Sequence, residues 1–198
     1  MKLKVNCDSE GIREAVKAVC DGKVIIFPTD TVYGMGCDPF NAKAVKEIFQ
    51  IKQRNTSKPL PVLGYSKNEL EKIAVLDKSH KNMIEKFWPG PLTIITKIKD
   101  AKLKESMNLD EKIAVRVPEN KCVLQVLKGC KLLVGTSANM SGQKPFVNSN
   151  ECFAQFKDIP VFVDGGDITS FGESTIIEIQ GDDLRIIRQG KITKQELL

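Results

Sequence analysis

The chain has 198 residues, of which 41% are hydrophobic and 28% are charged. This length suits one domain with a substantial core, and the composition excludes a disordered chain. No window approaches the ~18 uninterrupted apolar residues that a membrane helix needs, and the start, MKLKVNCDSE, lacks the apolar stretch of a signal peptide. We therefore expect a cytoplasmic protein without a membrane segment.

The net charge and the cysteines give little information about the function. The net charge is +5, from 30 Lys and Arg against 25 Asp and Glu. A mild positive excess suits a protein that handles phosphates or contacts RNA, but many ordinary proteins share it. The six cysteines show no Cys-x-x-Cys pair, so we predict buried small side chains or idle thiols rather than a zinc site or disulfides. They are Cys7, Cys20, Cys37, Cys122, Cys130 and Cys152.

Residues 9–20 predict the first helix, because their apolar side chains recur on one helical face, and Gly22 stands where a cap glycine belongs. The apolar run at residues 24–27 predicts a buried strand, which Pro28 ends. Asn41 is the predicted cap of a second helix.

Later segments continue this alternation. Helices are predicted at residues 81–87 and 121–127. Strands are predicted at residues 60–65, 92–95, 113–117, 132–134, 161–163, 175–179 and 184–187. The last two strands flank Gly181-Asp182-Asp183, which predicts a hairpin. The pattern predicts an α/β fold: a single domain over residues 1–198, with a core from about 9 to 190, in which helices pack around a twisted open mixed sheet.

The first candidate binding loop spans residues 28–36, directly after a predicted strand. Hydroxyl groups and glycines at the end of a strand are typical of ligand sites in open α/β sheets. The same residues also suit an ordinary turn in which Gly34 and Gly36 supply positive φ. Both interpretations are open.

Two further segments carry cations or small polar groups. Lys52, Arg54 and Lys58 follow the second helix, where they suit either a helix end or a phosphate clamp. Residues 135–142 follow a buried strand and suit either a plain loop or an anion site.

Arg116 and Arg188 lie within or at the end of strands, where each needs an ion pair or an anionic ligand. The single histidine, His80, is predicted on the surface of a lysine-rich helix, so a Ser-His-Asp triad is not indicated. Without a G-x-x-x-x-G-K-[ST] motif, a nucleotide site would not be a P-loop. The residues alone thus predict a cation-lined site for an anionic ligand.

Several segments together resemble the YrdC/Sua5 family of threonylcarbamoyl-AMP synthases, in the family's order and over ~165 residues. They are PTDTVYGMG, the spaced pair KQR and SAN, WPGPLT, AVRVP, SANMSG, and STII followed by IIR. The resemblance implies a twisted α/β fold with a positively charged concave surface. It also implies a reaction in which L-threonine and bicarbonate or CO2 form a carbamate that attacks the α-phosphate of ATP. The product then serves the t6A modification of adenosine 37 in tRNA, through a separate threonylcarbamoyl transferase complex.

The resemblance also implies roles for residues of this chain, with Mg²⁺ accompanying ATP and its ligands unidentified. Catalytic roles fall to Lys52, Arg54, Ser137 and Asn139. ATP binding falls to Arg54, Lys58, Ser137, Asn139 and Arg188. Threonine binding falls to Thr31, Arg116, Gly135 and Ser174. Asp30 and Asp38 are candidate Mg²⁺ ligands, although each also suits a turn or cap.

The chain departs from the family pattern at three positions. Lys58 replaces a common asparagine, Leu63 replaces a threonine-contacting histidine of longer members, and Gln189 replaces a proline. The chain resembles the short form without the extra C-terminal domain. Two alternatives are an RNA-binding protein with the same fold and a carbamoyl-transferring paralogue. Paralogues of that kind are large chains with zinc-finger-like cysteine clusters, and this sequence shows neither feature.

Overall fold

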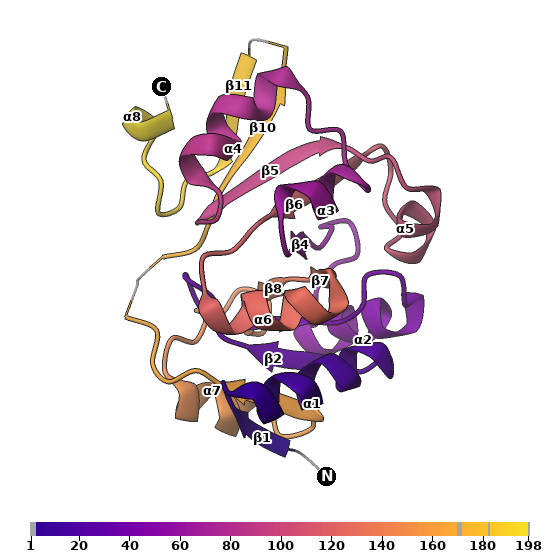
Figure 1. Cartoon of the computed structure of the whole chain (residues 1–198), viewed down its shortest axis with the longest axis vertical. Coiled ribbons are helices and arrows are strands. Elements are labelled where there is room, and N and C mark those ends of the chain that lie inside the picture. Colours follow the sequence, from indigo (N-terminus) through magenta and orange to yellow (C-terminus); the bar gives the residue numbers. More distant parts are fainter. Residues whose placement is uncertain (1–2, 170–171, 182, 198) are drawn as a thin grey trace.

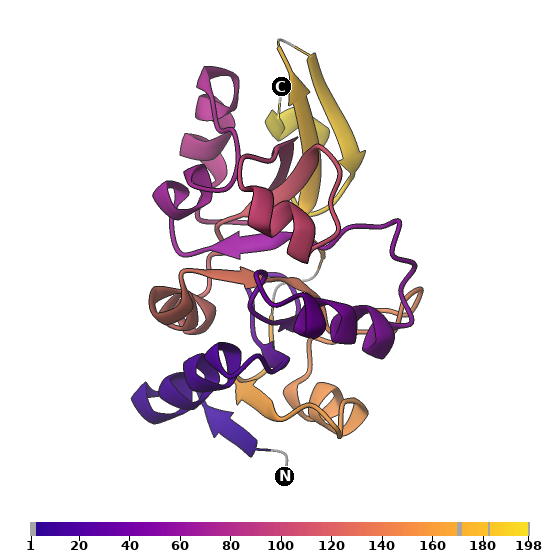
Figure 2. The ribbon, with the colours of Figure 1, turned by 90° about the vertical axis from the view of Figure 1, so that its right-hand side faces the viewer.

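The structure, a computed structural model, describes residues 3–169, 172–181 and 183–197 of the chain. It has the α/β architecture that the sequence predicts, with its strands arranged in two mixed sheets (Figure 1). In Figure 1 the first sheet lies in the lower half of the molecule and the second in the upper half, and Figure 2 shows the same two halves from the side. No helix of the described residues is long and apolar enough to cross a membrane.

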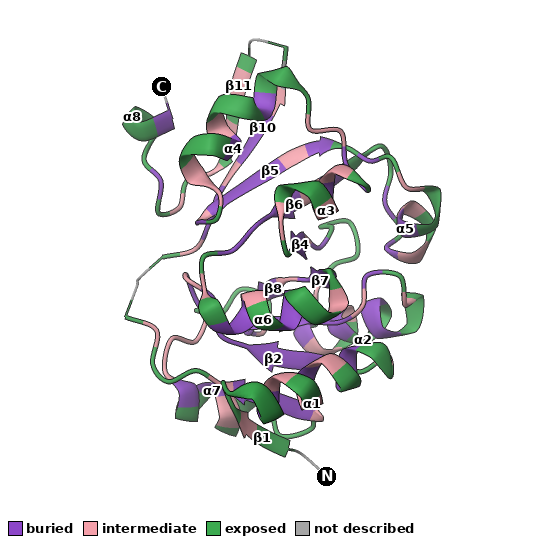
Figure 3. Ribbon diagram, viewed as in Figure 1, coloured by how far each residue is buried: buried purple, intermediate pink, exposed green. Residues whose placement is uncertain are grey.

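The first sheet is sandwiched between helices. Among the described residues its strands lie in the order β1 (Leu3–Asn6), β9 (Val161–Asp164), β2 (Ile25–Phe27), β3 (Gly34–Gly36) and β8 (Thr136–Ser137). Side chains alternate along β2, so Ile25 and Phe27 face one apolar cluster and Ile26 faces another. On the Phe27 side lie α1 (Ser9–Cys20) and α6 (Lys121–Cys130), and on the Ile26 side lie α2 (Ala42–Lys52) and α7 (Ser149–Gln155). Figure 3 shows β2 fully buried and these helices exposed on their outer faces.

The second sheet is covered by shorter helices. Its described strands lie in the order β11 (Asp183–Arg188), β10 (Thr175–Gln180), β5 (Leu92–Lys97), β6 (Lys112–Arg116), β4 (Val62–Gly64) and β7 (Leu132–Val134). Ile84 and Leu197 pack against Ile94 and Ile177 of this sheet. The covering elements are α3 (Lys67–Glu71), the 3-10 helix η1 (Lys78–His80), α4 (Lys81–Phe87), α5 (Ala101–Ser106) and α8 (Lys194–Leu197).

Local sequence signals account for several element ends. The Asn41 side chain accepts a hydrogen bond from the Ala44 N–H at 3.1 Å, which confirms the predicted cap of α2. Gly22 follows α1 with a φ of 72°, as expected of a cap glycine. The predicted hairpin is confirmed as the antiparallel pair β10 and β11, while Asp182 lies outside the described residues.

Close packing around β3 explains its two glycines. A Cβ atom on Gly36 would lie 1.9 Å from the carbonyl oxygen of Val134 in β7, and one on Gly34 would lie 2.8 Å from the Phe27 ring. Neither glycine has a positive φ, and both belong to β3. The turn interpretation of these glycines is therefore wrong. Gly36 is required by the close approach of β7 in the other sheet, and Gly34 leaves room for the Phe27 ring of the neighbouring strand β2.

One disulfide corrects the prediction for the cysteines. Cys7 and Cys122, which are separated by 115 residues in sequence, are bonded, with their Cα atoms 5.7 Å apart. The bond links the segment before α1 to the first turn of α6. The spacing of the cysteines carried no signal for it, because only the packing of α1 against α6 brings the two together.

The disulfide predicts a thiol count. The other cysteines, Cys20, Cys37, Cys130 and Cys152, are not part of a disulfide. A thiol reagent should therefore titrate four groups in the denatured, unreduced protein, and six after reduction. Six thiols before reduction would show that the bond does not form in solution.

Candidate active site

A cleft of about 640 Å³ opens where the two sheets meet. Its walls come from the loop after β2, the segment after α2, and residues of strands in both sheets. Most of the residues that the sequence predicts for the site line this cleft: Thr31, Arg54, Lys58, Arg116, Gly135, Ser137, Ser174 and Arg188. Lys52 and Asn139 do not line it.

Two arginines that line the cleft, Arg54 and Arg188, lie near enough for their charges to interact. Arg54 Nε donates to the carbonyl oxygen of Lys58 at 2.9 Å, and Nη2 donates to that of Pro59 at 3.2 Å. Burial lowers the pKa of Arg54, and the charge of Arg188 lowers it further. Because the two like charges repel each other, an anion bound beside both would be favoured.

Arg188 is held in place by the segment before β10. Its Nη1 pairs with Glu173 Oε1 at 2.7 Å, and its Nη2 donates to the Ser174 carbonyl oxygen at 2.8 Å and to Ser174 Oγ at 3.0 Å. Ser174 Oγ also lies 2.9 Å from Thr93 Oγ1. Of the described residues, Glu173 is the one carboxylate that lines the cleft, against four cationic side chains. The cleft is therefore electropositive.

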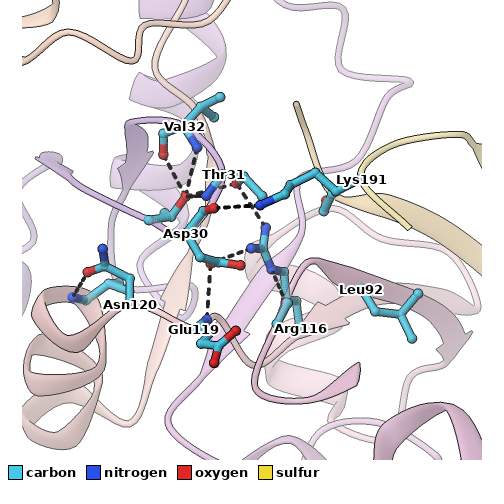
Figure 4. A network of polar contacts seen from close by, with 12 residues as sticks. Asp30, Thr31, Val32, Leu92, Arg116, Glu119, Asn120 and Lys191 are labelled. Atoms are coloured by element: carbon cyan, nitrogen blue, oxygen red, sulfur yellow. Dashed lines mark hydrogen bonds and ion pairs between the residues drawn. The ribbon is translucent and has the colours of Figure 1, made fainter. Parts of the chain in front are cut away.

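Arg116 also lines the cleft, and Figure 4 shows its polar contacts. Its Nη2 pairs with Asp30 Oδ1 at 2.6 Å, its Nε donates to the Gly90 carbonyl oxygen at 2.9 Å, and its Nη1 lies 3.4 Å from Thr31 Oγ1. Burial lowers the pKa of Arg116, and the carboxylate of Asp30 opposes this shift. Of the two partners that the sequence left open for Arg116, the structure shows the ion pair. Because Arg116 lines the cleft, an anionic ligand could reach it as well.

Lys52 lies behind the cleft and is almost completely buried, with 1% of its surface exposed. Its Nζ donates to the carbonyl oxygens of Ser137 and Asn139 and to Asn139 Oδ1. Asn139 Nδ2 donates in turn to the carbonyl oxygens of Met140 and Gln143. Because an ammonium group has three N–H donors, all of them have oxygen partners. Through these hydrogen bonds, Lys52 and Asn139 hold the loop that presents Ser137 to the cleft.

Titration of Lys52 yields a prediction about pH. Burial, aided by the charge of Arg54, lowers the pKa of Lys52 from 10.5 to about 8. The unfolded chain binds this proton more tightly, so the contribution of Lys52 to the free energy of unfolding rises as pH increases from about 8 to 10.5. Urea unfolding at about pH 7 and about pH 9.5 should show this rise in the wild type and not in Lys52→Met. Equal pH dependence of the two proteins would contradict it.

Apolar residues form much of the cleft surface, and the sequence did not single them out as site residues. Pro59, Ile95, Ala114, Ile176 and Ile187 all line it. Most of them lie on strands, where an apolar side chain is expected to belong to the hydrophobic core. Leu63, noted as a departure from the family pattern, also lines the cleft. A Cβ atom on Gly135 would lie 2.3 Å from the Cγ atom of Leu63, so this leucine packs directly against the glycine.

The remaining candidates lie elsewhere. His80 is buried, with 3% of its surface exposed, so the predicted surface position is wrong. Its Nδ1 lies 2.9 Å from Asp77 Oδ1, and it does not line the cleft. Asp38 accepts from the Phe40 N–H at 2.9 Å, as a turn residue does. Within the described ranges, no group of three or more His, Cys, Asp or Glu side chains could hold a metal ion.

Comparisons with known proteins agree on one family. The Sua5–YciO–YrdC family model, described as "Telomere recombination", matches residues 17–190. A protein of Klebsiella pneumoniae named threonylcarbamoyl-AMP synthase is 34% identical over 164 residues, which cover 81% of this chain and 86% of that protein.

Two solved structures resemble the whole chain. The crystal structure of P. abyssi Sua5 complexed with L-threonine has a TM-score of 0.91 and 28% identity, and the match covers 100% of this chain and 59% of that one. The crystal structure of E. coli YciO has a TM-score of 0.91 at 21% identity and covers both chains completely, which shows the shared fold.

Proposed function

Because the chain belongs to the Sua5–YciO–YrdC family, we propose that it is a threonylcarbamoyl-AMP synthase. This nucleotidyltransferase makes threonylcarbamoyl-AMP and pyrophosphate from L-threonine, bicarbonate or CO2, and ATP. One observation carries the proposal: a single cleft is lined by a buried arginine beside hydroxyl groups and by two further arginines whose charges interact. An amino acid and a polyphosphate need these two kinds of surface.

The surroundings of Arg116 suit threonine. A guanidinium group binds a carboxylate through two parallel hydrogen bonds, and hydroxyl groups both donate and accept, so they suit an amine and a hydroxyl. Thr31 and Ser174 supply such hydroxyls along the cleft. Gly135 also lines the cleft, and its lack of a side chain accommodates Leu63. We assign these four residues to threonine.

The surroundings of Arg54 suit the phosphates of ATP. We assign Arg54, Lys58, Ser137 and Arg188 to direct contacts, because all four line the cleft. Lys52 and Asn139 would act through the loop that they hold, rather than through contact with the nucleotide.

The chemistry needs no covalent attachment to the protein. The threonine carbamate attacks the α-phosphorus, the bond from that phosphorus to the bridging oxygen breaks, and pyrophosphate leaves. Negative charge grows on the departing pyrophosphate, so fixed cations lower the barrier by electrostatic stabilisation and positioning. ATP enters as its magnesium complex. The one carboxylate that lines the described cleft, Glu173, already pairs with Arg188, so phosphate oxygens and water would supply most ligands of that ion.

We further propose that residues 1–198 act as one cytoplasmic domain in the t6A pathway. A separate transferase complex would carry the product's threonylcarbamoyl group to adenosine 37 of tRNA. The positively charged face makes direct RNA binding the alternative activity.

Pyrophosphate release tests the proposal. The purified protein should release pyrophosphate from MgATP and bicarbonate only when L-threonine is added, with threonylcarbamoyl-AMP detected by mass spectrometry. Mixtures lacking bicarbonate serve as the control. If a folded protein releases none and instead binds RNA with an affinity that falls steeply with salt, the synthase assignment is wrong.

A further inference from the structure

Asp30 connects three segments of the chain beside the cleft. Its Oδ1 accepts from Arg116 Nη2 at 2.6 Å and from the Glu119 N–H at 3.1 Å. Its carbonyl oxygen lies 3.4 Å from Lys191 Nζ. Figure 4 shows Asp30 at the centre of these contacts. The residue therefore links the loop after β2 to the end of β6, the start of α6 and the segment after β11.

The Asp30 contact limits how Arg116 can point. A guanidinium group has five N–H donors. Three of them have partners in the structure: Nη2 donates to Asp30, Nε donates to the Gly90 carbonyl oxygen, and Nη1 donates to Thr31 Oγ1. One N–H on each terminal nitrogen therefore has no partner among the described residues. Two such donors suit a ligand with two oxygens, such as a carboxylate.

A negative partner is needed here for a physical reason. The Arg116 and Asp30 side chains are 7% and 11% exposed. Burying a guanidinium group to this extent destabilises the folded protein unless a negative charge lies beside it. Without Asp30, the Arg116 side chain would turn toward solvent or toward the anion in the cleft. Among the ion pairs of the described residues, this pair alone joins the strand ends of the two sheets.

Asp30 acts through Arg116, because it does not itself line the cleft. Its second oxygen, Oδ2, is buried and has no hydrogen-bond partner in the described part of the chain. We propose that Asp30 is a positioning residue for amino-acid recognition, which holds Arg116 in the orientation that receives the substrate carboxylate. This inference rests on the proposed function, since it takes threonine as the ligand.

Equilibrium binding and kinetics test the role of Asp30. Asp30→Ala should raise the Kd of L-threonine, measured by calorimetry without ATP, by about 30-fold or more, with less than about a threefold change in the Kd of MgATP. Asp30→Asn keeps an oxygen for Arg116. The Arg116 and Glu119 donors would orient the amide oxygen toward them, so about a three- to tenfold loss is expected. Asp38→Ala, which removes a turn carboxylate away from the cleft, is the matched control.

Two results would overturn the inference. The first is unchanged threonine affinity in Asp30→Ala, provided that the wild type binds threonine and releases pyrophosphate. The second is an equal loss of threonine and MgATP affinity in Asp30→Ala and Asp30→Asn, in proportion to a lowered Tm, which would indicate a purely structural role. Absence of threonine-dependent turnover in the wild type would instead refute the proposed function. The two failures are therefore distinguishable.

Discussion

Replacing Arg54 with alanine should lower kcat/KM for threonine-dependent pyrophosphate release by about 100- to 1000-fold, the effect of removing one preorganised donor from a charged transition state. Arg54 lines the cleft and is close enough to Arg188 for their charges to interact. The phosphates of ATP would lie between these two groups. The loss should appear mainly in kcat, because charge grows on the phosphates during the reaction. Steady-state pyrophosphate assays measure it.

Two variants serve as controls for Arg54. Arg54→Lys keeps the charge but loses the planar fork, so its activity should fall between those of the wild type and Arg54→Ala. Lys46→Ala removes an exposed cation from the same helix, α2, away from the cleft, and should leave activity unchanged. Equal activity of Arg54→Ala and wild type would remove Arg54 from the catalytic machinery.

Replacing Lys52 with methionine should destabilise the protein and inactivate it together. The variant keeps the length of the side chain but leaves the oxygens of Ser137 and Asn139 without their buried donor. Unpaired buried oxygens and the disrupted network should cost about 2–5 kcal/mol. For a chain of this size such a loss lowers Tm by roughly 5–15 °C. Thermal unfolding followed by circular dichroism measures the change.

Stability separates the role of Lys52 from that of Arg54. Arg54→Ala should lose activity with little change in Tm, because the removed group borders an open cleft. Lys46→Met on the outer face of α2 should change neither Tm nor activity. A Lys52→Met protein with wild-type Tm and low activity would instead place Lys52 in direct contact with the nucleotide.

Elements with a clear local pattern were predicted well. The helices at residues 9–20 and 81–87 have the predicted bounds, and the apolar strand runs became β2, β4, β5, β6, β7, β9, β10 and β11. Elements without such a pattern were missed. The edge strand β1 is largely exposed, and β3 contains two glycines, so neither shows the apolar run of a strand.

The α/β class, the family and the polar residues that could form an anion site follow from the amino-acid sequence, because periodicity, cap residues and ordered motifs are local properties of the chain. The positions of those residues in space follow from the packing of the fold. That packing put Arg116 beside Asp30 and Lys52 behind the loop of Ser137, and it joined Cys7 to Cys122. These contacts connect residues that are 85 to 115 positions apart. They depend on how the two sheets and their helices pack, and local sequence pattern does not encode that packing.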